Sequence, residues 1–159
     1  MRLYDFRTEY RENPIGLTEK APRFSWKIES DEKDTVQTSY EIKVTDENGK
    51  LVWDSGKKIS DQSVLISYEG EALAGETFYS VEVTVADNHG NVESVEGSFE
   101  TGIFNQTEFK AQMITSDFSE DETACPIFGK TFAIDKKVKK ARLYATAHGV
   151  YEVTLNGQT

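Results

Sequence analysis

The sequence predicts an all-β protein built as a sandwich, and three observations support that class. Short segments of alternating apolar residues recur over the first part of the chain, separated by turn residues every roughly 8–12 positions. No segment shows sustained helical periodicity. In residues 73–79 a Leu, a turn and then a Tyr precede a Val-x-Val strand, which is the sequence form of a tyrosine corner. These features predict a fibronectin type III or immunoglobulin-like β-sandwich, and the absence of paired cysteines favours the fibronectin type.

The strand that begins at this tyrosine is the longest one expected. Tyr79 and the three valines that follow it alternate with polar residues, the period-2 pattern of a strand with one buried face. The Asp-Asn-His-Gly sequence of residues 87–90 tolerates the positive φ of a hairpin turn and ends the strand. We therefore expect residues 79–85 to lie at the centre of the core, with the Tyr79 hydroxyl bonded to an upstream backbone group.

Six further strands are expected around this one. The first holds Leu3 and Phe6, and the second holds Trp26, which we expect to be the largest core residue. A compact loop over residues 11–17 lies between these two strands, and the Asn-Gly pair at 48–49 predicts a tight hairpin turn further along. The expected strand ranges are 2–9, 24–28, 40–45, 51–56, 63–68 and 95–101.

Charge is distributed unevenly along the 159 residues and divides the chain in two. The formal net charge of −10 falls entirely within residues 1–103, whereas acidic and basic side chains balance in residues 104–159. We therefore expect one complete sandwich domain over 1–103 and a second unit over 104–159. An acidic first domain argues against binding to nucleic acid or to an anionic membrane surface, because both need patches of Lys and Arg.

The chain is expected to be cytoplasmic and to lack a membrane span. No apolar run approaches the ~20 residues that a membrane helix needs. The N-terminal sequence lacks the apolar core of a signal peptide. The only cysteine, Cys125, excludes an intrachain disulfide and a Cys-rich zinc site, and we expect it to be a small buried hydrophobic residue. No cofactor is expected.

Residues 104–159 are expected to be the incomplete start of a second β-sandwich. The Asn-Gly pair at 156–157 predicts a hairpin turn, but only two residues follow it. A hairpin turn without its return strand predicts that this unit is truncated and that the native gene continues. The open strand edges of such a unit favour self-association. The strands expected in it are residues 128–134, 141–147 and 150–155.

Seven short blocks of sequence carry a family resemblance. In the first domain they are residues 9–17 (EYRENPIGL), 22–26 (PRFSW), 37–44 (QTSYEIKV), 53–57 (WDSGK) and 98–102 (SFETG). In the second unit they are residues 141–144 (ARLY) and 149–157 (GVYEVTLNG). In this order the blocks resemble the N-terminal domain of bacterial α-L-rhamnosidases and the start of the β-sandwich domain that follows it. The series as a whole is fairly specific to that family.

The resemblance implies a domain that is not itself catalytic. In that family, terminal α-L-rhamnosyl residues are hydrolysed in a helical α/α barrel with inversion of configuration, by two carboxylates across a water-sized gap. No such barrel is present in these 159 residues, so no catalytic residue is carried over to this chain. The resemblance thus implies a non-catalytic fragment of an inverting glycoside hydrolase, whose partner is the remainder of the parent enzyme.

Two alternatives stay open: a carbohydrate-binding module, and an adhesion-type fibronectin domain with no enzyme attached. Trp53, Tyr68 and Tyr151 are the residues whose rings could stack on a sugar if they are exposed, although core packing is the commoner role of such rings. A bound carbohydrate is therefore a candidate partner of the chain.

Acidic side chains cluster in several predicted loops, where we expect them to be solvated. A catalytic acid needs a pKa raised by burial or by a like charge, and these loops lack apolar enclosure. No metal site is expected, because neither of the two histidines has a second His or Cys at ligand spacing. The acidic groups are Asp31/Glu32/Asp34, Asp46/Glu47, Glu93/Glu96 and Asp117/Glu120/Asp121/Glu122.

Overall fold

The computed structural model describes residues 1–117 and 125–158, and the chain divides into two units. The first unit is Met1–Phe109 and the second is Lys110–Thr159. Strands dominate the first unit, and the one helix in the described residues is the short 3-10 helix η1 (Gln106–Glu108). The predicted all-β class is confirmed. No helix in this part of the chain is long and apolar enough to cross a membrane.

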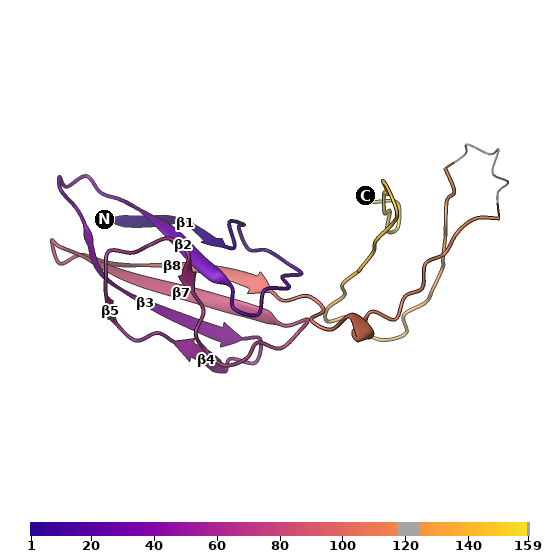
Figure 1. Cartoon of the computed structure of the whole chain (residues 1–159), viewed down its shortest axis with the longest axis horizontal. Helices are drawn as coiled ribbons and strands as arrows, with labels where there is room; N and C mark the ends of the chain where they lie inside the picture. The colour runs from indigo at the N-terminus through magenta and orange to yellow at the C-terminus, as the bar shows by residue number, and fades with distance from the viewer. Residues whose placement is uncertain (118–124, 159) are drawn as a thin grey trace. The chain divides into compact units, whose positions relative to one another are not determined.

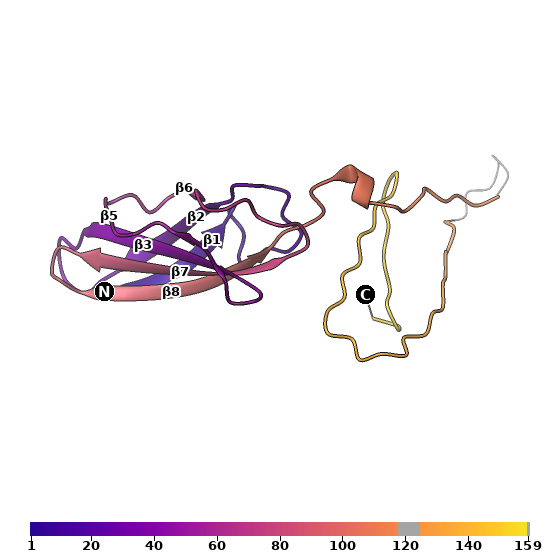
Figure 2. The ribbon, with the colours of Figure 1, turned by 90° about the horizontal axis from the view of Figure 1, so that it is seen from below.

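The first unit is a sandwich of two antiparallel sheets, drawn in two views in Figures 1 and 2. The smaller sheet has the strand order β1-β2-β6, and the larger has the order β4-β3-β7-β8, with β5 also paired to β3. The immunoglobulin-like sandwich predicted from the sequence is thus confirmed. The strands are β1 (Arg2–Thr8), β2 (Arg23–Glu29), β3 (Gln37–Asp46), β4 (Leu51–Asp54), β5 (Lys58–Ile59), β6 (Ile66–Ser67), β7 (Phe78–Asp87) and β8 (Val92–Glu100).

The long strand β7 lies between β3 and β8 and pairs with both along its length. Its inward-facing residues, Tyr79 and the three valines after it, are almost completely buried, which confirms the prediction for this strand. Asp87 closes the turn that follows, because its Oδ1 accepts hydrogen bonds from the backbone N–H groups of His89 and Asn91, both at 2.9 Å.

The tyrosine corner predicted before β7 is present. Leu73 and Tyr79 are both buried, and the Tyr79 hydroxyl oxygen accepts a hydrogen bond from the backbone N–H of Ala74 at 2.8 Å. The Tyr79 ring also stacks on the Phe99 ring, with the centroids 5.1 Å apart. The hydroxyl therefore fixes the turn at residues 74–77 to the edge of the core.

The Tyr79→Phe variant is expected to lower the free energy of unfolding by about 1 kcal/mol, because the ring stays packed while the Ala74 N–H loses its acceptor. Urea unfolding measures this loss. Tyr4→Phe is the matched control, since Tyr4 is partly exposed and no hydrogen bond to its hydroxyl is found in the described residues. Equal stability of the two variants would contradict a stabilising role for the corner.

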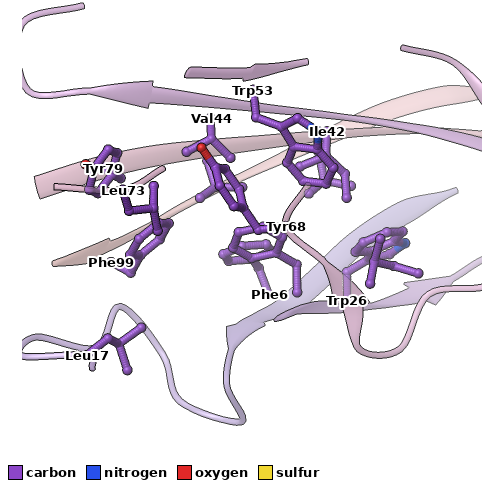
Figure 3. Close-up of a cluster of buried hydrophobic side chains, with 14 of the residues drawn as sticks. Phe6, Leu17, Trp26, Ile42, Val44, Trp53, Tyr68, Leu73, Tyr79 and Phe99 are labelled. Carbon is purple, nitrogen blue, oxygen red and sulfur yellow. The ribbon is translucent and has the colours of Figure 1, made fainter. Parts of the chain in front are cut away.

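The core between the sheets is built from aromatic and branched aliphatic side chains of both sheets, shown in Figure 3. Phe24 is fully buried, and its ring packs against three others. The centroid distances are 5.9 Å to Phe6, 6.2 Å to Trp53 and 6.0 Å to Phe99. Trp26 is the largest fully buried side chain in the described residues, as predicted.

Strand β1 contains a β-bulge that simple alternation does not predict. The register between β1 and β2 shifts between Tyr4 and Arg7, and Asp5 has a φ of 50°. The extra residue lets both Leu3 and Phe6 face the core, although they are three positions apart. The bulge therefore explains how both apolar residues of this short strand are buried.

Two other segments form shorter strands than the sequence predicts. The predicted strand 51–56 forms β4 only as far as Asp54, and the predicted strand 63–68 forms β6 only at Ile66–Ser67. Leu65 has a φ of 54°, far from the extended region. The chain therefore enters β6 only after this residue.

The second unit contains no strand in residues 110–117 and 125–158. The predicted hairpin turn at 156–157 is present, and Leu155 and Gln158 exchange backbone hydrogen bonds of 2.7 and 3.0 Å across it. The three segments predicted as strands are irregular here and leave most of their large apolar side chains exposed. Isolated pairs of strands are marginally stable in water. A second sandwich in this unit stays a prediction.

Candidate functional site

The loop of residues 9–17, between β1 and β2, is the candidate functional site of the first unit. Three non-glycine residues in it, Glu9, Tyr10 and Asn13, have φ values of 47°, 66° and 42°, in the left-handed region. Each such residue costs of order 1–3 kcal/mol, and residues of this kind cluster at functional sites. A loop that keeps three of them must be held firmly by its surroundings.

One side of the 9–17 loop is held by an ion pair between Glu9 and Arg23, the first residue of β2. The Glu9 carboxylate accepts hydrogen bonds from Arg23 Nε at 3.0 Å, from Nη2 at 2.7 Å and from the backbone N–H at 2.8 Å. These bonds from Arg23 hold the pKa of the Glu9 carboxyl below its ordinary value of 4.5, against the opposing effect of burial. The pair therefore links the strained start of the loop to the smaller sheet.

The other side of the loop is held by β8 in the larger sheet. Asn13 Oδ1 accepts hydrogen bonds from the Ser98 N–H at 2.9 Å and from the Ser98 hydroxyl at 3.2 Å. The Glu100 N–H donates to the Pro14 carbonyl oxygen, and the Leu17 N–H donates to the Glu100 carbonyl oxygen, both at 2.9 Å. The loop thus crosses the end of the sandwich from one sheet to the other, at the end where β8 finishes (Figures 1 and 2).

This anchoring leaves two large apolar side chains on the outside of the loop. Tyr10 is 68% exposed and Ile15 is 65% exposed. The Arg23 guanidinium lies 5.8 Å from the centroid of the Tyr10 ring, within cation–π range. Tyrosine and arginine beside an exposed aliphatic residue have the composition of a protein–protein contact.

A groove of about 510 Å³ lies beside the loop and takes residues from both β1 and β8. Asp5 in this groove is neutralised by Lys27 Nζ at 2.7 Å and Arg7 Nε at 2.6 Å, and these hydrogen bonds lower the pKa of its carboxyl. Asp5, Glu12 and Glu96 are three carboxylates of the lining, and Arg2, which lies 3.9 Å from Glu29, is its one cation, so the lining side chains are acidic on balance. Its lining residues are Arg2, Tyr4, Asp5, Phe6, Glu12, Asn13, Val95 and Glu96.

Glu9→Gln is expected to lower the free energy of unfolding by about 1 kcal/mol at pH 7, a value reduced because Arg23 is partly exposed. The folded-state pKa of Glu9 lies below the unfolded value, so its contribution is complete above that unfolded value. The contribution is lost as the pH falls through the folded pKa. Urea unfolding from pH 7 to pH 3 should therefore show the wild type and the variant converging in acid. A stability difference that does not change with pH would contradict the ion pair as its cause.

Two of the three residues predicted to bind carbohydrate lie in the core. Trp53 is 9% exposed and Tyr68 is 5% exposed, and their ring centroids lie 5.2 Å apart. Burial raises the pKa of Tyr68 to about 12, and its hydroxyl donates to the Glu71 carbonyl oxygen at 2.7 Å. Neither ring has the free face that stacking on a sugar needs. Both rings instead pack in the core, the commoner role of such residues. Tyr151 is 53% exposed in the second unit, and sugar binding by it stays a prediction.

Asp46, one of the acidic residues of the predicted loops, accepts hydrogen bonds from backbone N–H groups. Asp46 Oδ1 accepts hydrogen bonds from the N–H groups of Asn48 and Lys50, at 2.8 and 2.9 Å, and closes the turn between β3 and β4. The Lys50 and Asn48 bonds lower the pKa of Asp46. Of the acidic group at 117–122, Glu120, Asp121 and Glu122 lie outside the described residues.

Cys125 is exposed, so the expectation that it is a buried hydrophobic residue is wrong. Its neighbours from 126 to 158 pack into no core that could cover it. Within residues 1–117 and 125–158, no group of three or more His, Cys, Asp or Glu side chains is arranged to hold a metal ion.

The sequence predicts a compact loop over residues 11–17, and residues 9–17 form one of the blocks that carry the family resemblance. That pattern does not identify Tyr10 and Ile15 as exposed, because the positive φ of Glu9 and Tyr10 has no signature in residue type, unlike that of Asn13. The sequence feature that could have indicated their exposure is local: Tyr10 and Ile15 are large apolar residues in a polar stretch that also contains Pro14.

The fold and this loop define the first unit as an immunoglobulin-like β-sandwich domain with an anchored loop across one end. The chain belongs to the family described as Rha78A-like, N-terminal immunoglobulin domain, which matches residues 3–105. The family resemblance predicted from the sequence blocks is therefore confirmed.

The relatives of the chain are much longer than the chain itself. An α-L-rhamnosidase of Formosa agariphila is 32% identical over 92% of this chain, and one of Alteromonas sp. is 33% identical over the same share. The chain spans 18% of the length of each. The solved structure of a Streptomyces avermitilis α-L-rhamnosidase with L-rhamnose is 34% identical over 69% of this chain and 11% of that chain, with a TM-score of 0.65. That of Dictyoglumus thermophilum α-L-rhamnosidase is 36% identical over 69% and 13%, with a TM-score of 0.62.

Proposed function

We propose that the chain is a non-catalytic domain of a larger α-L-rhamnosidase, a glycoside hydrolase that removes terminal α-L-rhamnosyl residues. The observation that carries the proposal is the family match over residues 3–105, joined to relatives named α-L-rhamnosidases of which the chain spans 18%. The catalytic groups of the parent enzyme would then lie in the part of those relatives that this chain does not cover.

The chemistry of the first unit supports a structural role. A general acid for glycoside hydrolysis needs a carboxyl whose pKa is raised. The pKa values of Asp5, Glu9 and Asp46 are instead lowered by their hydrogen bonds. Asp5 stabilises a strand, Glu9 a loop and Asp46 a turn, and these are structural roles.

Rhamnose release from an aryl α-L-rhamnoside tests the proposal. We expect the 159-residue chain to release none and the product of the complete native gene to release rhamnose. Release by the chain alone would show that catalysis lies within it, and inactivity of the complete product would remove the assignment to this enzyme class. Titration of the chain with L-rhamnose separates the alternative, since binding that Tyr151→Ala abolishes would favour a carbohydrate-binding module.

A further inference from the structure

We infer that the 9–17 loop, with the acidic groove beside it, is the surface on which the rest of the parent polypeptide docks. This inference rests on the proposed function, because the occupant is a domain of the same enzyme. It goes further by assigning the contact to one end of the sandwich and to two side chains, Tyr10 and Ile15. The complementary surface would be apolar where it meets these side chains and basic where it meets the groove.

The first step is that the loop is ordered before anything binds to it. Its backbone is fixed to both sheets through Arg23, Ser98 and Glu100, as described above. A contact made by a preordered loop loses little conformational entropy on association. Within this ordered loop, which includes the positive-φ residues Glu9, Tyr10 and Asn13, most of the surface of Tyr10 and Ile15 remains exposed.

The second step is the position of the loop at the exit of the chain from the sandwich. Leu17 pairs in parallel with Thr101, and the Gly102 N–H donates to the Leu17 carbonyl oxygen at 2.6 Å. A Cβ at Gly102 would lie 2.9 Å from the Gly16 carbonyl oxygen, so the exit segment passes directly against the loop. A later domain of the same polypeptide is tethered at this point, and tethering raises its effective concentration at nearby surfaces.

The third step is the chemistry of the surface. Tyr10 beside the Arg23 guanidinium combines the two residue types that most often dominate binding at protein interfaces, together with tryptophan. Glu12 lies in the loop and also lines the groove, where Glu96 is a further carboxylate and Arg2, paired with Glu29, is the one cation of the lining. Opposite charge on the docking domain would fix its orientation.

Hydrogen exchange in the complete gene product, compared with the 159-residue chain, tests the inference. We expect the amides of residues 10–16 to exchange at least roughly tenfold more slowly in the complete product. The double variant Tyr10→Ala/Ile15→Ala should abolish that difference and should leave the 159-residue chain folded, with only the small loss of stability expected from the exposed cation–π contact with Arg23. The matched control is Ile59→Ala/Val92→Ala, which removes two exposed apolar side chains from β5 and β8 and should keep the protection.

Equal exchange of residues 10–16 in the two proteins would overturn the inference. So would protection that appears in the 159-residue chain with increasing concentration, together with a dimer in sedimentation, because the occupant would then be a second copy. Failure of the proposed function is recognised separately. A complete product that shows the protection but hydrolyses no rhamnoside would retain the docking surface and lose the enzyme assignment.

Discussion

Replacing Trp26 with alanine is expected to lower the free energy of unfolding of the first unit by about 3–5 kcal/mol, the range for truncating a large buried aromatic side chain. Trp26 is 2% exposed, and its ring lies edge-on to that of Tyr40 with the centroids 5.5 Å apart. Its indole N–H donates to Gln37 Oε1 at 3.0 Å in a buried hydrogen bond. The substitution therefore leaves a cavity and also a buried acceptor without its donor, and both effects destabilise the fold.

The effect should also reach the chain between β5 and β6. The side-chain amide of Gln37 donates to the carbonyl oxygens of Ser60 and Gln62, at 3.0 and 2.8 Å. Trp26 orients this amide by binding its oxygen, and so it helps to fix a segment that forms no strand. We therefore expect faster hydrogen exchange around residues 60–63 in the variant.

Urea unfolding followed by far-ultraviolet circular dichroism measures the loss. Trp26→Phe keeps a buried ring but removes the N–H donor, so its expected loss is smaller, about 1–3 kcal/mol. Ile59→Ala, at a position 81% exposed, should change the stability by less than about 0.5 kcal/mol. A loss below about 1 kcal/mol for Trp26→Ala would show that the site repacks and that the indole is not central to the core.

Much of the sandwich follows from residue pattern alone, because strands such as β2 and β7 bury alternate side chains. Alternation locates β7 and places Tyr79 inward, and the Leu-turn-Tyr sequence predicts the tyrosine corner with its hydroxyl bonded to the backbone at Ala74. Alternation fails at Asp5 and Leu65. Both have positive φ without being glycine, and both contact β2, far away in the sequence: Asp5 pairs with Lys27, and the Leu65 N–H donates to Ser25 Oγ.

The candidate site could be predicted less well than the fold, and the reason is exposure. Trp53, Tyr68 and Tyr151 are equally plausible as sugar-stacking residues from type alone, and only the packing of the two sheets places Trp53 and Tyr68 inside. Conversely, the exposed Tyr10 follows Glu9, which is bound to a residue 14 positions later in the chain. Such a long-range ion pair leaves no periodic trace in the sequence.

Gly97→Ala is expected to lower the free energy of unfolding by about 1–2 kcal/mol. A Cβ at this position of β8 would overlap Cδ1 and Cε1 of Phe6 on β1. Phe6 is buried and stacks on the fully buried Phe24, so its ring has no free space to move into. Overpacking of a core costs about 1–3 kcal/mol, whereas replacing glycine with alanine in a strand interior gains only about 0.5–1 kcal/mol. The steric term therefore dominates.

A double-mutant cycle with Phe6→Ala separates this steric clash from any effect on β8 itself. Phe6→Ala alone should cost about 3–5 kcal/mol, because it removes a buried ring. In the double variant the alanine at 97 meets no ring. The losses of the two single variants should therefore sum to about 1–3 kcal/mol more than the loss measured for the double variant. Glu93→Ala, an exposed change on the same strand, is the control and should have little effect. If the losses of Gly97→Ala and Phe6→Ala are strictly additive, the alanine at 97 does not clash with the Phe6 ring. The glycine would then be needed for the backbone of β8, and not to make room for Phe6 between the edge strands β1 and β8.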